Sequence, residues 1–138
     1  MIGALALVVL SAAAAVVFLA WRASAQHDVL TGRAGKCRAG DAAACDSLRT
    51  ACLKRSPEAC ELLAGAYLAE KGPDPHEAVG LFEEACTYRG ADGCFRAGSM
   101  VAAGQGVPKD ASHARDLFTR GCSLGSADAC AAKRKLGD

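Results

Sequence analysis

The sequence predicts an all-α protein, a right-handed α-solenoid of helix-turn-helix units stapled by disulfides. The first observation is that all eight cysteines fall in four frames, each with seven residues between two cysteines. The second is that the sequence between frames also repeats, with a step of 34 residues from Cys60 to Cys94 and of 36 from Cys94 to Cys130. Repeats of this length are typical of stacked helix pairs. The four frames are Cys37 to Cys45, Cys52 to Cys60, Cys86 to Cys94 and Cys122 to Cys130.

The beginning of the chain is apolar and stands apart from the predicted repeats. Ile2 to Trp21 contains no charged side chain, and a helix of about 20 apolar residues is long enough to cross a bilayer. Ala23-Ser24-Ala25 before Gln26 is typical of a signal-peptide cleavage site. The length of the run, and the lack of a preceding Lys or Arg, favour an anchor instead. Residues 1–25 are therefore predicted to be a signal peptide or an N-terminal membrane anchor, and both alternatives stay open.

Two signals disagree about the compartment. Four basic residues follow the apolar run, and the positive-inside bias would leave the repeats in the cytoplasm; they are Arg22, Arg33, Lys36 and Arg38. Paired cysteines, in contrast, persist outside the reducing cytosol. We give the eight framed cysteines more weight and predict a periplasmic or secreted protein, membrane-attached only through residues 2–21 if these are uncleaved. The alternative is a membrane-tethered cytoplasmic protein whose cysteines are small buried hydrophobes.

The balance of basic and acidic side chains limits the classes of partner that the protein is expected to bind. Only Arg22 among the charged residues precedes Gln26, so the rest of the chain has 15 basic and 15 acidic side chains. A protein without a basic excess is not expected to bind nucleic acid. Residues 26–36 contain two glycines and little periodicity, and we predict a linker there.

Helix starts are marked inside the cysteine frames. A residue that suits an N-cap stands four positions before each second cysteine; these residues are Asp41, Ser56, Gly90 and Ser126. Each second cysteine should therefore lie in the first turn of a helix, while the first cysteine ends the preceding helix. The expected helices are 42–53, 58–70, 76–87, 92–103, 111–122 and 127–136.

Two of these helices show a clear apolar stripe. Apolar or small residues recur at i, i+3, i+4 and i+7 in both, as Ala78, Leu81, Phe82 and Ala85 and as Ala114, Leu117, Phe118 and Gly121. The stretch Asp74-Pro75-His76-Glu77 predicts a capping box with proline at the first helical position. Asp110 is the corresponding cap of the next copy.

The expected helix ends determine which cysteines can meet. One cysteine in a last helical turn and one in the next first turn can approach closely enough for a disulfide. Pairing within each frame is therefore predicted, and each bond closes a nine-residue ring worth about 2.5 kcal/mol on the loop-entropy model. Cys45 and Cys52 lie about 10 Å apart along one helix, too far to bridge.

Other roles for the cysteines fit less well. There is no C-x-x-C motif and His27, His76 and His113 stand alone, so neither a metal nor another cofactor is predicted. An even set of paired cysteines also leaves no thiolate for catalysis.

Two further features of the sequence are interpreted as structural. Tyr67 aligns with Val101 in the repeat, which predicts packing between helices. Lys133-Arg-Lys135 suits a helix C-terminus, where positive charge is favourable.

The second full repeat carries a recognisable pattern. Gly98-Ser-Met-Val101-Ala-Ala-Gly104-Gln-Gly106-Val107-Pro-Lys-Asp110, with the frame that ends at Cys130, resembles the Sel1-like repeat. The paired cysteines resemble its cysteine-rich, secreted branch, the Helicobacter cysteine-rich proteins. The resemblance is clear over 94–130, good over 60–94 and weak over 37–60. We predict a repeat domain at 37–138, with full repeats at about 60–93 and 94–129 and partial repeats at each end.

The resemblance implies a tetratricopeptide-like superhelix with one disulfide per repeat. It also implies a non-catalytic scaffold whose concave face binds a protein or a peptide. The alternative is a penicillin-binding or weak β-lactamase-type hydrolase, because some cysteine-rich relatives are described in this way. None of the eight serines has a lysine three residues on, as a serine β-lactamase requires. No catalytic residue is therefore predicted.

Overall fold

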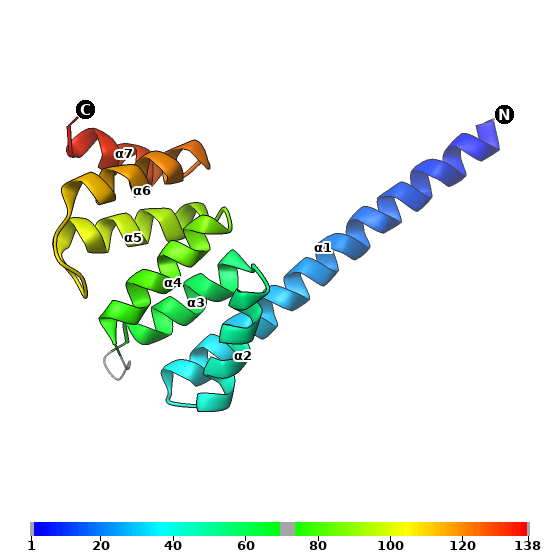
Figure 1. The fold of residues 1–138 in the computed structure, drawn as a ribbon. Helices are drawn as coiled ribbons and strands as arrows, with labels where there is room; N and C mark the ends of the chain where they lie inside the picture. Colours follow the sequence, from blue (N-terminus) through cyan, green and yellow to red (C-terminus); the bar gives the residue numbers. More distant parts are fainter. Residues whose placement is uncertain (1, 70–73, 138) are drawn as a thin grey trace. The chain divides into compact units, whose positions relative to one another are not determined.

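The computed structural model describes residues 2–69 and 74–137, of which residues 2–11 are described by their backbone alone. The chain divides into two compact units, Met1–Gly32 and Arg33–Asp138. All regular secondary structure in the described ranges is helical, and it comprises seven helices, α1 to α7 (Figure 1).

The first unit is formed by most of α1, which spans Ile2–Arg38. The expected linker at 26–36 is thus helical, because it contains no proline and two isolated glycines cost a helix only about 1 kcal/mol each. Thr31 also donates its hydroxyl hydrogen to backbone carbonyls one turn earlier. Across the described residues, no helix combines the length and the apolar character needed to span a membrane. The first half of the predicted apolar segment, residues 2–11, lies outside the described side chains.

The second unit is a stack of helices in sequence order (Figure 1). Each helix packs against the next one along the chain, and α5 also contacts α3 and α7. This arrangement confirms the predicted all-α fold of consecutive helix pairs stapled by disulfides. The helices are α2 (Ala42–Leu53), α3 (Pro57–Tyr67), α4 (Pro75–Thr87), α5 (Ala91–Ala103), α6 (Ala111–Ser123) and α7 (Ala127–Lys135).

The caps explain where these helices begin. Asp41, Ser56 and Ser126 each accept a hydrogen bond from the backbone N–H three residues on, as N-caps do. Asp74 caps α4 by accepting from the His76 N–H at 2.8 Å. This bond is the first half of the predicted capping box, and the Glu77 carboxylate of the same box pairs with Arg49 at 3.5 Å.

The core is built from small side chains around a few larger ones. The predicted stripe of α4 is buried, with Phe82 completely inaccessible at its centre. The stripe of α6 is buried in the same way, and Ala59 and Ala64 of α3 and Ala97 of α5 are fully buried. α3 ends at Tyr67, three residues before the predicted end, where the N–H of Ala69 bonds to Ala66 instead of continuing the helical ladder.

Candidate binding site

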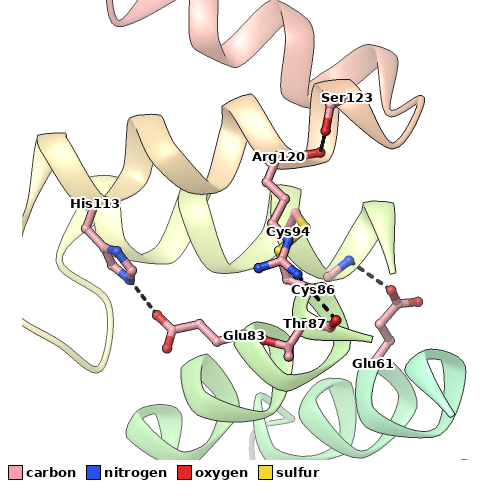
Figure 2. The surroundings of a disulfide bond; sticks show 9 residues. Glu61, Glu83, Cys86, Thr87, Cys94, His113, Arg120 and Ser123 are labelled. Carbon is pink, nitrogen blue, oxygen red and sulfur yellow. Dashed lines mark hydrogen bonds and ion pairs between the residues drawn. A yellow bond between two sulfur atoms is a disulfide. The ribbon is translucent and has the colours of Figure 1, made fainter. Parts of the chain in front are cut away.

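The cysteine frames are the joints that orient the helices of the repeat. Each frame contains one disulfide, and its two Cα atoms lie 4.5–4.8 Å apart. Within the described residues no cysteine is free. Figure 2 shows the central bond, Cys86–Cys94, which joins the end of α4 to the first turn of α5. Both sulfurs are buried, so this staple belongs to the core.

The same backbone turn occurs in every frame. The residue three positions after the first cysteine has a positive φ, and these residues are Gly40, Arg55, Arg89 and Gly125. The next N–H bonds back to a carbonyl five residues earlier, for example from Gly90 to Ala85 at 2.8 Å. This is the Schellman motif of a helix C-terminus. It reverses the chain over a fixed number of residues, and the second cysteine therefore returns to the first.

The N-terminus of α5 has an unusual cap. Gly90 has no side chain to accept a hydrogen bond, and the Gly93 N–H donates instead to Glu61 of α3 at 2.8 Å (Figure 2). A Cβ on Gly90 would come within 2.6 Å of this Glu61 carboxylate. The absence of a side chain at Gly90 thus makes room for a cap from the preceding repeat.

The environment of Glu61 makes its ionised form less favourable. Partial burial raises the pKa of the Glu61 carboxyl, and the negative charges of Asp92 and Glu58 act in the same direction. The Gly93 N–H and the Arg96 guanidinium oppose this shift, but the pKa remains above its ordinary value. Glu61 is therefore a cap whose strength depends on pH.

A pocket of about 340 Å³ opens on the surface formed by α3, α5 and α7, which we call the α3–α5–α7 face. Most of its lining comes from one side of α5, at positions spaced three or four residues apart. The volume lies near the lower end of the range of about 300–1,000 Å³ that is usual for ligand pockets. The lining residues are Leu68, Phe82, Asp92, Phe95, Arg96, Ser99, Met100 and Asp128.

The apolar side of this pocket rests on a close contact between α5 and α6. The rings of Phe95 and Phe118 lie 6.1 Å apart, centroid to centroid. Phe118 also packs directly on Gly98, where a Cβ would come within 2.7 Å of the ring. The absence of a side chain at Gly98 thus lets Phe118 of α6 pack closely on α5, next to Phe95. Leu68 contributes a more exposed apolar side chain from the end of α3.

Of the two carboxylates in the pocket, only one has a charged partner in the described part of the chain. Asp92 accepts a hydrogen bond from Arg96 Nε at 2.6 Å, one helical turn away. The guanidinium of Arg96 lies 5.6 Å from the centre of the Phe82 ring and covers it. Asp128, at the start of α7, makes no side-chain hydrogen bond or ion pair with any residue that the structure describes. Two carboxylates and one guanidinium leave this pocket with a net charge of about −1 at neutral pH.

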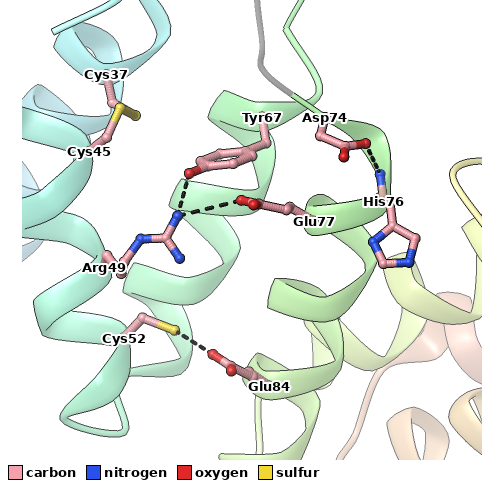
Figure 3. A network of polar contacts seen from close by, with 9 residues as sticks. All are labelled: Cys37, Cys45, Arg49, Cys52, Tyr67, Asp74, His76, Glu77 and Glu84. Carbon is pink, nitrogen blue, oxygen red and sulfur yellow. Dashed lines mark hydrogen bonds and ion pairs between the residues drawn. A yellow bond between two sulfur atoms is a disulfide. The ribbon is translucent and has the colours of Figure 1, made fainter. Parts of the chain in front are cut away.

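A second polar cluster joins α2, α3 and α4 (Figure 3). Arg49 donates to the Tyr67 hydroxyl and pairs with the Glu77 carboxylate at 3.5 Å. Burial alone would lower the pKa of Arg49, but Tyr67 and Glu77 together outweigh it and raise the pKa. All three groups satisfy one another, so this cluster holds the helices together and offers no free group to a ligand.

Cys52, Cys60 and Glu84 also lie close together, with Glu84 Oε2 3.2 Å from Cys52 Sγ (Figure 3). Three such groups could hold a metal ion only if both cysteines were thiolates. The two sulfurs are bonded to each other. They are therefore not available as ligands while the disulfide is intact.

Two residues singled out in the sequence have partners that sequence reasoning missed. His113 stands alone in the sequence, and its Nε2 lies 2.8 Å from Glu83 Oε1 of α4 (Figure 2). Tyr67 is buried, as is Val101 at the corresponding position of the next repeat, and its hydroxyl accepts a hydrogen bond from Arg49. Glu83 and Glu61 carried no signal of their own, because each acts on a residue about 30 positions further along.

Comparison with known proteins identifies similar chains. The family model described as Sel1 repeat matches residues 57–87 and 91–126. Among solved structures, the chain is similar to Helicobacter pylori cysteine rich protein B, with 27% sequence identity and a TM-score of 0.59. The similarity covers 76% of this chain and 92% of that chain. No curated protein matches the chain.

Proposed function

Because the chain is a Sel1 repeat protein, we propose that it is a non-catalytic scaffold that holds a peptide segment of a partner protein on its α3–α5–α7 face. The observation that carries this proposal is the pocket of about 340 Å³ on that face. It combines apolar side chains with a few polar groups, as peptide-binding and ligand-binding surfaces do. Its size suits a short piece of chain better than a large rigid ligand.

The chemistry of the pocket supports binding in preference to catalysis. Its serine, Ser99, donates its hydroxyl hydrogen to the Phe95 carbonyl of its own helix at 2.8 Å. No base among the pocket residues contacts that hydroxyl, so nothing there activates it as a nucleophile. The charged side chains of the pocket, Asp92, Arg96 and Asp128, can stabilise a bound peptide by ion pairing. None of them is placed as a general acid or a general base beside Ser99.

We also propose that this scaffold works outside the cytoplasm. Four disulfides in a small repeat unit are typical of proteins from oxidising compartments. The similarity to Helicobacter pylori cysteine rich protein B, which its name describes as cysteine-rich, is in keeping with this location. Alkylation of living cells followed by intact-mass measurement tests it: protein made in its own host should carry four disulfides, whereas eight alkylated thiols would contradict the proposal.

Site-specific photo-cross-linking tests the binding face. The full chain would carry a photoreactive phenylalanine analogue in place of Ser99, inside the pocket, or in place of Asp116, exposed on α6. Irradiation should give a defined adduct at position 99 and none at position 116. Equal labelling at both positions, or no adduct at either, would count against the α3–α5–α7 face as the binding surface.

A further inference from the structure

The pocket on the α3–α5–α7 face has a chemical preference that follows from its unequal charges. One carboxylate, Asp92, is already neutralised by Arg96 at 2.6 Å. The other, Asp128, has no charged or hydrogen-bonding partner among the residues that the structure describes. Both line the same hollow. The excess charge of the pocket is therefore negative and resides at its α7 side.

Helix polarity accounts for the presence of these carboxylates but not for their position in a pocket. Asp92 and Asp128 occupy the first turns of α5 and α7, where a negative charge stabilises the helix. Glu58 has the same place in α3, yet it does not line the pocket. Asp92 and Asp128 thus have a second property that Glu58 lacks: they face the same apolar side chains.

Those apolar side chains suit the stem of a long basic residue. Leu68, Phe95 and Met100 line the hollow together with the two carboxylates. Lysine and arginine have aliphatic stems that bury against apolar surface while the charged head reaches a polar group. Arg96 is held by Asp92 and lies over the Phe82 ring, and among the described residues it forms no ion pair with Asp128.

Resting on the proposed peptide-binding function, we infer that the pocket selects a peptide segment in which a lysine or arginine stands beside an apolar residue. The basic head pairs with the Asp128 carboxylate, and its stem lies on Leu68 and Phe95. The apolar neighbour of the basic residue contacts Met100 and the rest of the apolar side. Arg96 acts as a selectivity element, since its own positive charge partly offsets the attraction of the site for cations.

Peptide selection on the oxidised full chain tests the inference separately from the proposed function. A library of random seven-residue peptides displayed on phage would be selected on this protein, with the fully reduced and alkylated chain as the control surface. Enrichment of sequences with lysine or arginine beside an apolar residue is expected. Enrichment of neutral or acidic sequences would overturn the charge preference but leave peptide binding intact. No enrichment over the control surface would overturn the proposed function itself.

Three variants then locate the preference in the pocket. For an enriched basic peptide, Asp128→Asn should weaken binding by about 1.5- to fivefold, the range of an exposed charge pair. Arg96→Gln should strengthen binding by a similar factor, because it frees Asp92 and removes a repelling charge. Asp116→Asn changes the net charge equally on α6, outside the pocket, and should leave the affinity unchanged. Equal affinities for all four proteins would overturn the assignment.

Discussion

Glu61 shows how a single side chain can join two repeats. It lies on α3 and accepts a hydrogen bond from Gly93 at the start of α5, although α4 separates the two helices in sequence. An N-cap normally comes from the residue that begins the helix, but Gly90 has no side chain to provide one. The first turn of α5, which carries Asp92 of the pocket, therefore depends on the preceding repeat for its cap.

The stability of the protein should depend on pH through Glu61. Its pKa is raised above the ordinary value of 4.5 by burial, so folding favours the protonated form. The stabilisation is complete below the unfolded-state pKa and is lost as the pH rises through the folded-state pKa. Glu61→Gln keeps an oxygen that can accept from Gly93 but does not titrate. Wild type should therefore gain stability relative to Glu61→Gln as the pH falls from 7 to 4, measured by urea unfolding.

A constant difference between the two proteins across this range would contradict the role of burial at Glu61. As a control for the cap itself, Glu61→Ala removes the acceptor and should be about 1 kcal/mol less stable than Glu61→Gln at every pH, because neither variant titrates and the difference is the usual cost of a lost N-cap.

Two helical glycines make a second comparison at the residue scale. Gly98→Ala should destabilise the protein by about 1–3 kcal/mol, because the new Cβ would come within 2.7 Å of the Phe118 ring. Gly65→Ala, in α3, has open space around its Cβ and should stabilise by about 0.5–1 kcal/mol through helix propensity. Thermal unfolding of the two variants checks both signs. Stabilisation by Gly98→Ala would show that the α5–α6 contact is not tight at Gly98, and destabilisation by Gly65→Ala would show that the space beside Gly65 is not open.

Single residues also mark the limit of sequence reasoning. The N-caps could be predicted, since Asp41, Ser56 and Ser126 act on residues three positions away. The cap from Glu61 could not, because it depends on a spatial approach between two helices. Glu77 fitted a capping box locally but pairs with Arg49 of a different helix. In both cases the partner of the carboxylate lies on another helix, so it could not be predicted from neighbouring residues in the sequence.

At the scale of the element, the turn inside each frame fixes the direction of the next helix. Gly40 and Gly125 adopt the left-handed conformation without cost, whereas Arg55 and Arg89 adopt it at φ 65° and 71°. A side chain in this region is strained by about 1–2 kcal/mol. The sequence contained a partial signal, since Gly40 and Gly125 stand at the same place in their frames, but the arginines at the other two frames concealed it.

Exchange of these residues should have opposite effects on stability. Arg89→Gly relieves the left-handed strain and should stabilise by about 0.5–1 kcal/mol, after the larger loss of backbone entropy at glycine is included. Gly125→Arg introduces the same strain into the last frame, where the surrounding space is open, and should destabilise by about 0.5–1 kcal/mol after the same entropy correction. Chemical unfolding of both variants measures the pair. Destabilisation by Arg89→Gly would show that the Arg89 side chain contributes a contact that outweighs the strain.

The helices themselves were largely predictable from their periodicity. The stripes of α4 and α6 follow the helical repeat and are buried as expected. The segment 26–36 was expected to be a linker because it has no stripe, yet it continues α1. A helix can form there without an apolar face, since nothing in that segment breaks the hydrogen-bond ladder. Amphipathic patterns therefore predict packed helices better than they predict helicity.

At the scale of the whole molecule, the second unit is a one-dimensional stack that lacks a single large core. Each helix packs mainly against its neighbours in sequence, and most buried side chains are small. Such a stack gains stability from repeat interfaces and from its staples. The number and positions of the helix pairs followed from the cysteine frames. The pocket did not, because it lies between alternate helices, whose approach is a property of the assembled stack.

Full reduction should therefore unfold the repeat unit. Four nine-residue rings, each worth about 2.5 kcal/mol, add up to about 10 kcal/mol, comparable with the total stability of about 5–15 kcal/mol of a typical domain. Reductant at 25 °C should remove most of the helical circular dichroism of α2–α7, and reoxidation should restore it. Alkylating agent added to the oxidised protein is the control. Retention of cooperative thermal unfolding after complete reduction would show that packing alone is sufficient.

The closed rings also determine how the molecule responds to proteolysis. A cut at any bond between the two cysteines of a frame, such as within 87–93, leaves both fragments joined through sulfur. The nicked protein gains only the mass of one water and runs as a single band until it is reduced. A cut between frames separates the chain at once. Comparison of reduced and unreduced gels thus reveals on which side of a joint a protease has acted, and a host enzyme could open a turn without releasing either half.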